Sequence, residues 1–117
     1  MTNKKRIEYD SLGQKKIDKD RLWGAQTQRS LENFKIGNET IPHEVIIALG
    51  KQKRAAALAN MELGLLNKKI GNQIIEACKK IINLDLINDF PLSVWQTGSG
   101  TQTNMNANEV ISNYVIK

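Results

Sequence analysis

Apolar residues recur at helical spacing along much of the chain, and this pattern predicts its main elements. Residues 42–63 begin with Pro42 and are followed by Gly64, the arrangement that commonly starts and ends a helix. Their apolar residues lie three, four or seven positions apart, as on one side of a helix. The side predicted to be buried consists of Val45, Ile46, Leu49, Ala56 and Leu63. We therefore predict a long helix over 42–63.

Two further helices follow from the same spacing. Residues 68–83 carry an apolar stripe, which predicts a second helix. The stripe consists of Ile70, Ile74, Cys78 and Ile81. Residues 84–92 are predicted to form a connection, because Pro91 disfavours helix in the residue before it. The last helix is expected after Gly100, and its predicted buried side consists of Val110, Ile111, Tyr114 and Val115.

The first third of the chain has a different pattern. Residues 6–18 alternate around the turn at 11–13, which predicts a small β-ribbon. Its predicted inward contacts are Ile7, Tyr9 and Ile17. Residues 23–34 are predicted to form a loop with one or two helical turns. The fold class that follows is mainly α with a short N-terminal β-ribbon.

Composition limits the class of protein. The chain has 117 residues, 40% of them hydrophobic and 25% charged, which suits one globular domain. No apolar run approaches the ~20 residues of a membrane-spanning helix. The basic start lacks the apolar core of a secretory signal, and no transit peptide is seen. We expect no membrane partner and a cytoplasmic location, or the mitochondrial matrix if the source is eukaryotic.

Charge and the rare ligand residues exclude further classes. The net charge is +5, but the basic pairs are dispersed and aromatic residues are only 5%, so no nucleic-acid partner is expected. Cys78 is the only cysteine, which excludes an internal disulfide and a cysteine-cluster metal site, and we expect it to be buried. His43 is the only histidine, and we expect it at the surface. No metal or cofactor is therefore predicted.

The candidate chemistry lies in the run from Trp95 to Glu109, which is rich in small and amide residues. Its glycines allow close approach of backbone to a ligand, and the first N–H groups of the following helix attract anions. Ser99 and Gln102 have the spacing of a capping box, which places the Ser99 hydroxyl at the mouth of the helix. From chemistry alone, two interpretations stay open: an anion site, and a polar turn that only caps the helix.

Three segments carry a resemblance to a known family: QTGSGTQTNMNANE at 96–109, LWGAQTQRS at 22–30 and KRAAA at 53–57. They resemble class II fumarase, a member of the aspartase and fumarase superfamily. Aspartase resembles the chain less, because it carries a Y-G-x-H-T-type stretch where this chain has 23–27, and G-A-G-T-S where this chain has 98–102.

The resemblance implies a fold, a reaction and a set of residues. The parent enzyme would hydrate fumarate reversibly to (S)-malate in the citric acid cycle, as a homotetramer without a cofactor. The positions that match the family's contacts to the substrate carboxylate are Ser99, Gly100 and Thr101, with Thr97, Gln102, Asn104 and Asn106 as possible supporting positions. Arg29 could pair with a carboxylate of the substrate or of the protein, and the structural pairing is the default expectation.

No catalytic residue is implied within this chain. The family's water-activating histidine, its serine base on a mobile loop with a lysine and an asparagine, and its S-S-N segment have no counterpart here. We therefore expect residues 1–117 to be a truncated N-terminal, lyase-type domain without the central helical bundle and C-terminal domain, and to be inactive alone. The alternatives are an aspartase-like N-terminal domain and a non-enzymatic helical interaction module.

Overall fold

The computed structural model describes residues 4–34, 39–93 and 101–116. Two strands, β1 (Lys5–Asp10) and β2 (Gly13–Asp18), form an antiparallel ribbon in which Lys5 pairs with Asp18 and Asp10 with Gly13. The helices are α1 (Ala25–Asn33), α2 (His43–Glu62), α3 (Lys68–Ile82) and α4 (Thr101–Ile116), and Ile87–Asp89 form one 3-10 turn. The predicted fold class is thus confirmed.

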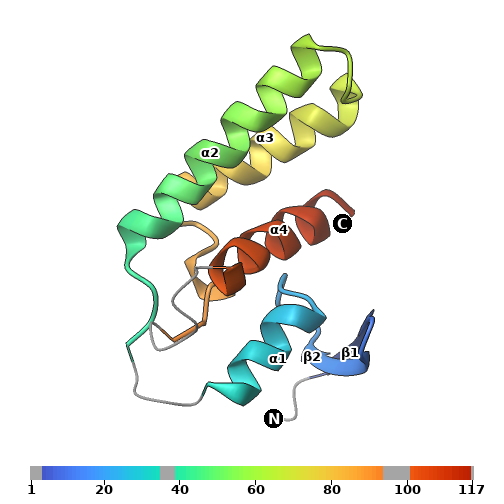
Figure 1. The fold of residues 1–117 in the computed structure, drawn as a ribbon, viewed down its shortest axis with the longest axis vertical. Helices are drawn as coiled ribbons and strands as arrows, with labels where there is room; N and C mark the ends of the chain where they lie inside the picture. Colours follow the sequence, from blue (N-terminus) through green and yellow to red (C-terminus); the bar gives the residue numbers. More distant parts are fainter. Residues whose placement is uncertain (1–3, 35–38, 94–100, 117) are drawn as a thin grey trace.

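Helix α4 occupies the centre of the molecule. Helices α2 and α3 form a long antiparallel hairpin on one side of it, and α1 with the β-ribbon lies on the other (Figure 1). Contacts of α4 with α1, α2 and α3 hold these layers together. The core between the hairpin and α4 consists of Ile46, Ala77, Cys78, Ile81, Phe90, Ala107, Val110 and Ile111. Helix α4 is therefore held from both sides.

The two long helices and the connection after them agree with the predicted ranges within about one residue at each end. Asn67 caps α3, since its side chain accepts from the N–H groups of Lys69 and Ile70. Cys78 is fully buried and His43 exposed, as predicted. Helix α1 has nine residues, more than the one or two turns expected.

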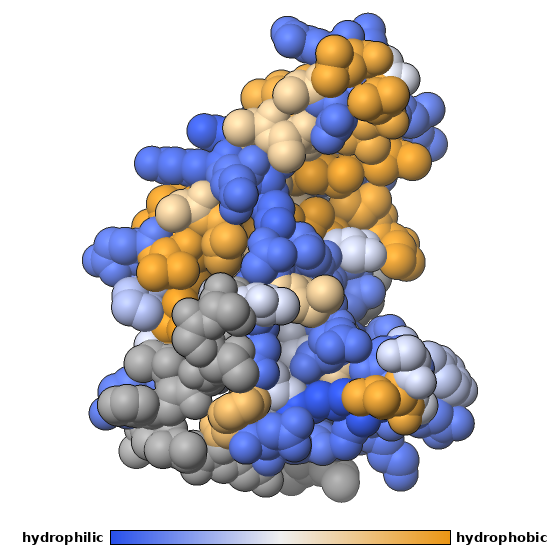
Figure 2. Space-filling view, viewed as in Figure 1, coloured by the Kyte–Doolittle hydropathy of each residue, from blue (hydrophilic) through white to orange (hydrophobic). Residues whose placement is uncertain are grey.

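Parts of the predicted apolar sides are wrong, most of all towards the end of the α2–α3 hairpin that extends beyond α4 (Figure 1). Ile46 and Ile81 are buried against the core, but Val45, Leu63 and Ile70 are exposed. Figure 2 shows hydrophobic surface over the hairpin, far from the β-ribbon. A helix packed on one side by its hairpin partner alone buries a shorter stripe than its periodicity suggests.

The inward side of the β-ribbon also differs from the prediction. Ile17 is fully buried, but Ile7 and Tyr9 are 49% and 68% exposed. The alternate residues of β1, which include Arg6 and Asp10, are the partly buried ones. Their side chains make partly buried polar contacts with α1 and the segment before it, and these contacts determine which face of the strand turns inward.

Helices α2 and α3 approach each other closely at Gly50. A Cβ atom at Gly50 would lie 2.9 Å from Ile82 Cγ1 and 3.0 Å from Ile81 Cγ2. Ala57 is buried, but Ala55 and Ala56 are exposed. The missing side chain of Gly50 is therefore what lets the helices pack closely.

Candidate functional site

The start of α4 carries four of the seven predicted site positions. Thr101 is its first residue and is exposed, and Gln102, Asn104 and Asn106 follow in the first two turns. Thr97, Ser99 and Gly100 lie outside the described residues, and so does the Ser99 half of the predicted capping box. The structure therefore places Thr101 where a ligand could reach its hydroxyl, at the positive end of the α4 dipole.

A cavity of about 210 Å³ lies between α1 and the start of α4. Thr101 and Gln102 line it from α4, and Arg29 and Ser30 line it from α1. Ser30 is only 5% exposed, and two oxygen atoms at this place, Ser30 Oγ and Gln102 Oε1, are buried without a hydrogen-bond partner. Among the described lining residues, Arg29 is the only one with an ionisable side chain. The described part of this cavity thus offers hydrogen-bonding groups and no general base.

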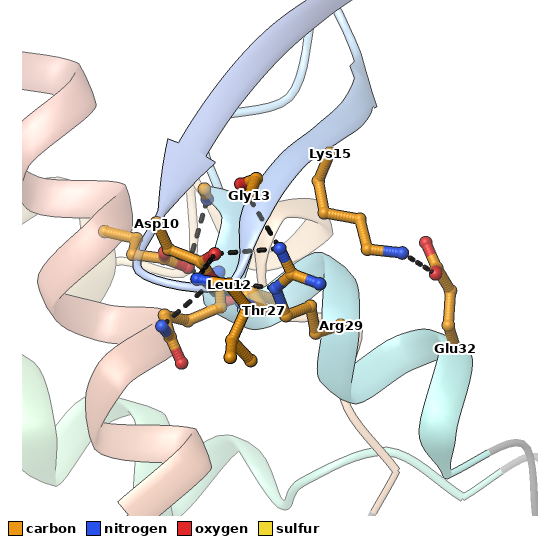
Figure 3. A network of polar contacts seen from close by, with 10 residues as sticks. Asp10, Leu12, Gly13, Lys15, Thr27, Arg29 and Glu32 are labelled. Atoms are coloured by element: carbon orange, nitrogen blue, oxygen red, sulfur yellow. Dashed lines mark hydrogen bonds and ion pairs between the residues drawn. The ribbon is translucent and has the colours of Figure 1, made fainter.

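Arg29 pairs with a carboxylate of the protein itself, Asp10, as the default expectation from the sequence was. Its Nε donates to Asp10 Oδ2 at 2.7 Å, and its Nη2 donates to Asp10 Oδ1 at 2.8 Å and to the Gly13 carbonyl at 3.2 Å (Figure 3). The guanidinium holds the pKa of Asp10 below its ordinary value of 3.8, and the carboxylate raises the pKa of Arg29. This bidentate pair anchors the β-ribbon turn to α1.

The amides of α4 connect the helix to three separate segments. Lys53 Nζ on α2 donates to Asn104 Oδ1 at 2.6 Å. Asn106 is 1% exposed, and its Nδ2 donates to the Asp89 carbonyl at 2.9 Å. Asn113 Nδ2 donates to the Leu22 carbonyl at 2.7 Å. These amides serve as structural anchors, so Asn104 and Asn106 act on the start of α4 by holding it in place.

Glu109 is the contact that sequence reasoning missed. Its Oε1 accepts from the N–H groups of Gly24 and Thr27 at 3.1 and 2.9 Å and from the Thr27 hydroxyl at 2.6 Å, while Oε2 accepts from the Gln26 N–H at 3.0 Å. Gly24 provides no side-chain cap for α1, so this carboxylate, 85 residues away, caps the helix instead. A local capping pattern could not have revealed it.

Two observations bear on other kinds of site. Within the described ranges, no helix is long and apolar enough to cross a membrane. The same ranges hold no cluster of three or more histidine, cysteine, aspartate or glutamate side chains that could bind a metal ion.

Comparison with known proteins shows the family of the chain. A family model described as lyase matches residues 13–117. The chain is 56% identical over 108 residues to a class II fumarate hydratase of Helicobacter pylori, covering 92% of this chain and 23% of the relative. It is 58% identical over 113 residues to that of Prochlorococcus marinus, covering 97% and 24%. The chain thus spans about a quarter of the length of these relatives.

Solved structures agree with the sequence matches. A class II fumarase from Schistosoma mansoni superposes with a TM-score of 0.93 at 42% identity, over 96% of this chain and 24% of that one. A fumarate lyase:delta crystallin from Brucella melitensis superposes with a TM-score of 0.90 at 40% identity, over 97% and 27%. The resemblance to class II fumarase seen in the motifs is confirmed, and the chain belongs to the lyase family.

Proposed function

We propose that this chain is the N-terminal part of a class II fumarate hydratase, which adds water reversibly to fumarate to give (S)-malate. The observation that carries the proposal is the 56–58% identity to relatives of that name over nearly the whole chain. In this proposal the enzyme is a homotetramer of the citric acid cycle. The cytoplasmic location stays a prediction from the sequence.

The chain's share in the reaction is to bind one carboxylate of the substrate. Ser99, Gly100 and Thr101 supply hydroxyl and backbone N–H donors where the helix dipole favours negative charge. Proton removal beside a carboxylate builds further negative charge on that group, so donors fixed in place there lower the barrier. Thr101 is assigned binding rather than proton transfer, since an unassisted hydroxyl is a poor base at neutral pH.

Residues 1–117 alone are expected to be inactive. The family's base and second carboxylate segment have no counterpart in this sequence, and no described residue that lines the cavity beside Thr101 is a carboxylate or a histidine. Malate formation by the purified chain, freed of contaminating enzyme, would contradict this.

The activity is tested in a chimaera that joins residues 1–117 to the remaining three quarters of the Helicobacter pylori relative. It should consume fumarate with water, measured by loss of ultraviolet absorbance. Preference for ammonia over water would favour the aspartase-like alternative. A chimaera that folds and assembles but shows neither activity would favour the interaction module.

Thr101→Ala in the chimaera tests the assignment of the site. Loss of a hydrogen bond to a charged group should lower kcat/KM by roughly 10- to 100-fold. Ser112→Ala is the matched control, because Ser112 is an exposed hydroxyl residue on the same helix. Its kcat/KM should change by no more than about two-fold. Equal kinetics for the two variants would remove Thr101 from the site.

A further inference from the structure

Lys53 extends from α2 to the first turn of α4. Its ammonium donates to Asn104 Oδ1 at 2.6 Å in a partly buried contact. Asn104 lies three residues after Thr101, so the two side chains are neighbours on one side of the helix. Given this spacing, the Lys53 charge lies within roughly 10 Å of the Thr101 side chain.

No internal carboxylate neutralises this ammonium within the described ranges. The ion pairs found there are Lys5–Asp18, Arg6–Glu8, Lys15–Glu32 and Arg29–Asp10. Lys53 belongs to none of them, and its hydrogen-bond acceptor is a neutral amide. The first turn of α4 also lacks an acidic residue, although acidic residues are favoured there. The lysine charge and the helix dipole therefore add at the start of α4, an arrangement that is unfavourable until an anion arrives.

We infer that Lys53 is a positioning residue of the carboxylate site, which fixes the first turn of α4 through Asn104 and strengthens the binding of a doubly charged dicarboxylate. The inference rests on the proposed function and deepens it, since it adds the source of the charge that Thr101 and its neighbours lack. Lys53 acts through Asn104 and through space, without touching the substrate.

The test uses the active chimaera and separates charge from packing. Lys53→Met keeps the apolar stem of the side chain and removes the charge, so KM for fumarate should rise roughly ten-fold, the effect of one charge at about 10 Å near a protein surface. The kcat should fall as well, because the negative charge that builds on the carboxylate in the transition state also loses the attraction of the Lys53 ammonium. Lys53→Arg keeps the charge, so its KM for fumarate should equal that of the wild type. Lys51→Met, an exposed lysine of the same helix, is the control.

Asn104→Asp neutralises the ammonium in place and complements the Lys53 variants. It places a carboxylate of nearly the same shape against the ammonium, so KM should rise as in Lys53→Met. The thermal midpoint should stay equal or rise, because an ion pair forms and an acidic residue enters the first turn of the helix. A merely structural role for Lys53 predicts no change of KM in Lys53→Met, whereas the carboxylate of Asn104→Asp repels a dicarboxylate whatever Lys53 does. The rise in KM should also shrink as salt is added, since salt screens the charge.

The outcomes distinguish the role of Lys53 from the proposed function of the chain. An active chimaera whose Lys53→Met and Asn104→Asp variants keep the wild-type KM would overturn the role of Lys53 and leave the proposed function standing. A lower thermal midpoint and lower kcat with unchanged KM in Lys53→Met would assign Lys53 to packing alone and also overturn the inference. A folded but inactive wild-type chimaera would overturn both.

Discussion

Removal of the Glu109 carboxylate should loosen α1 from α4. In Glu109→Ala, four donors on α1 and the residue before it lose their acceptor. Water can replace the partner of the exposed Gln26 N–H, but the N–H and hydroxyl of Thr27, which is 1% exposed, stay buried and unpaired. Each unpaired buried donor costs about 1–3 kcal/mol, so the variant should lose about 3 kcal/mol of unfolding free energy. Glu109→Gln keeps one acceptor oxygen and should lose about half as much.

Urea unfolding of the chain, followed by circular dichroism, measures this loss. The midpoint of Glu109→Ala should fall by roughly 1–3 M, given the urea dependence typical of small domains. Glu76→Ala, which removes an exposed glutamate in the middle of α3, serves as the control. A Cβ atom at Gly24 would lie 2.6 Å from Glu109 Oε2, so Gly24→Ala should cost less in the Glu109→Ala background than in the wild type. Equal midpoints for Glu109→Ala and Glu76→Ala would refute the capping role.

Three further predictions concern pH, packing and the thiol. The pKa of Asp10 is lowered by Arg29, so the stability from this pair is present above the ordinary pKa of Asp10 and is lost as the pH falls through the lowered one. Asp10→Asn should flatten this part of the stability–pH curve, and an unchanged curve would contradict it. Gly50→Ala should lose about 1 kcal/mol in urea unfolding despite the better helix propensity, because its Cβ would crowd Ile82; a gain in stability would show that the helices adjust. Burial raises the pKa of Cys78, so a disulfide reagent should label it only as the chain unfolds, and rapid labelling without urea would count against a buried thiol.

The helices and the ribbon could be predicted because their signals are local. Apolar spacing and Pro42 located α2 within a residue at each end, and alternation around the turn before Gly13 located the ribbon. The inward side of the ribbon could not be predicted from hydrophobicity. Apolar Ile7 and Tyr9 lie on the exposed face of β1, and polar Arg6 and Asp10 lie on the partly buried face. Which set turns inward depends on partners on α1.

The sequence by itself determined the order of the elements, the buried thiol and the family motif, since each depends on neighbours along the chain or on a continuous run of residues. Tertiary structure decided what the polar residues of α4 do. Asn106 and Glu109 belong to one run of small and amide residues, yet Asn106 binds the Asp89 carbonyl and Glu109 binds the start of α1. Asn113, one turn further along, binds the Leu22 carbonyl. Lys53 and Asn104 meet across 51 positions of sequence. Contacts of this kind arise from the packing of helices in space, and no periodicity along the chain encodes them.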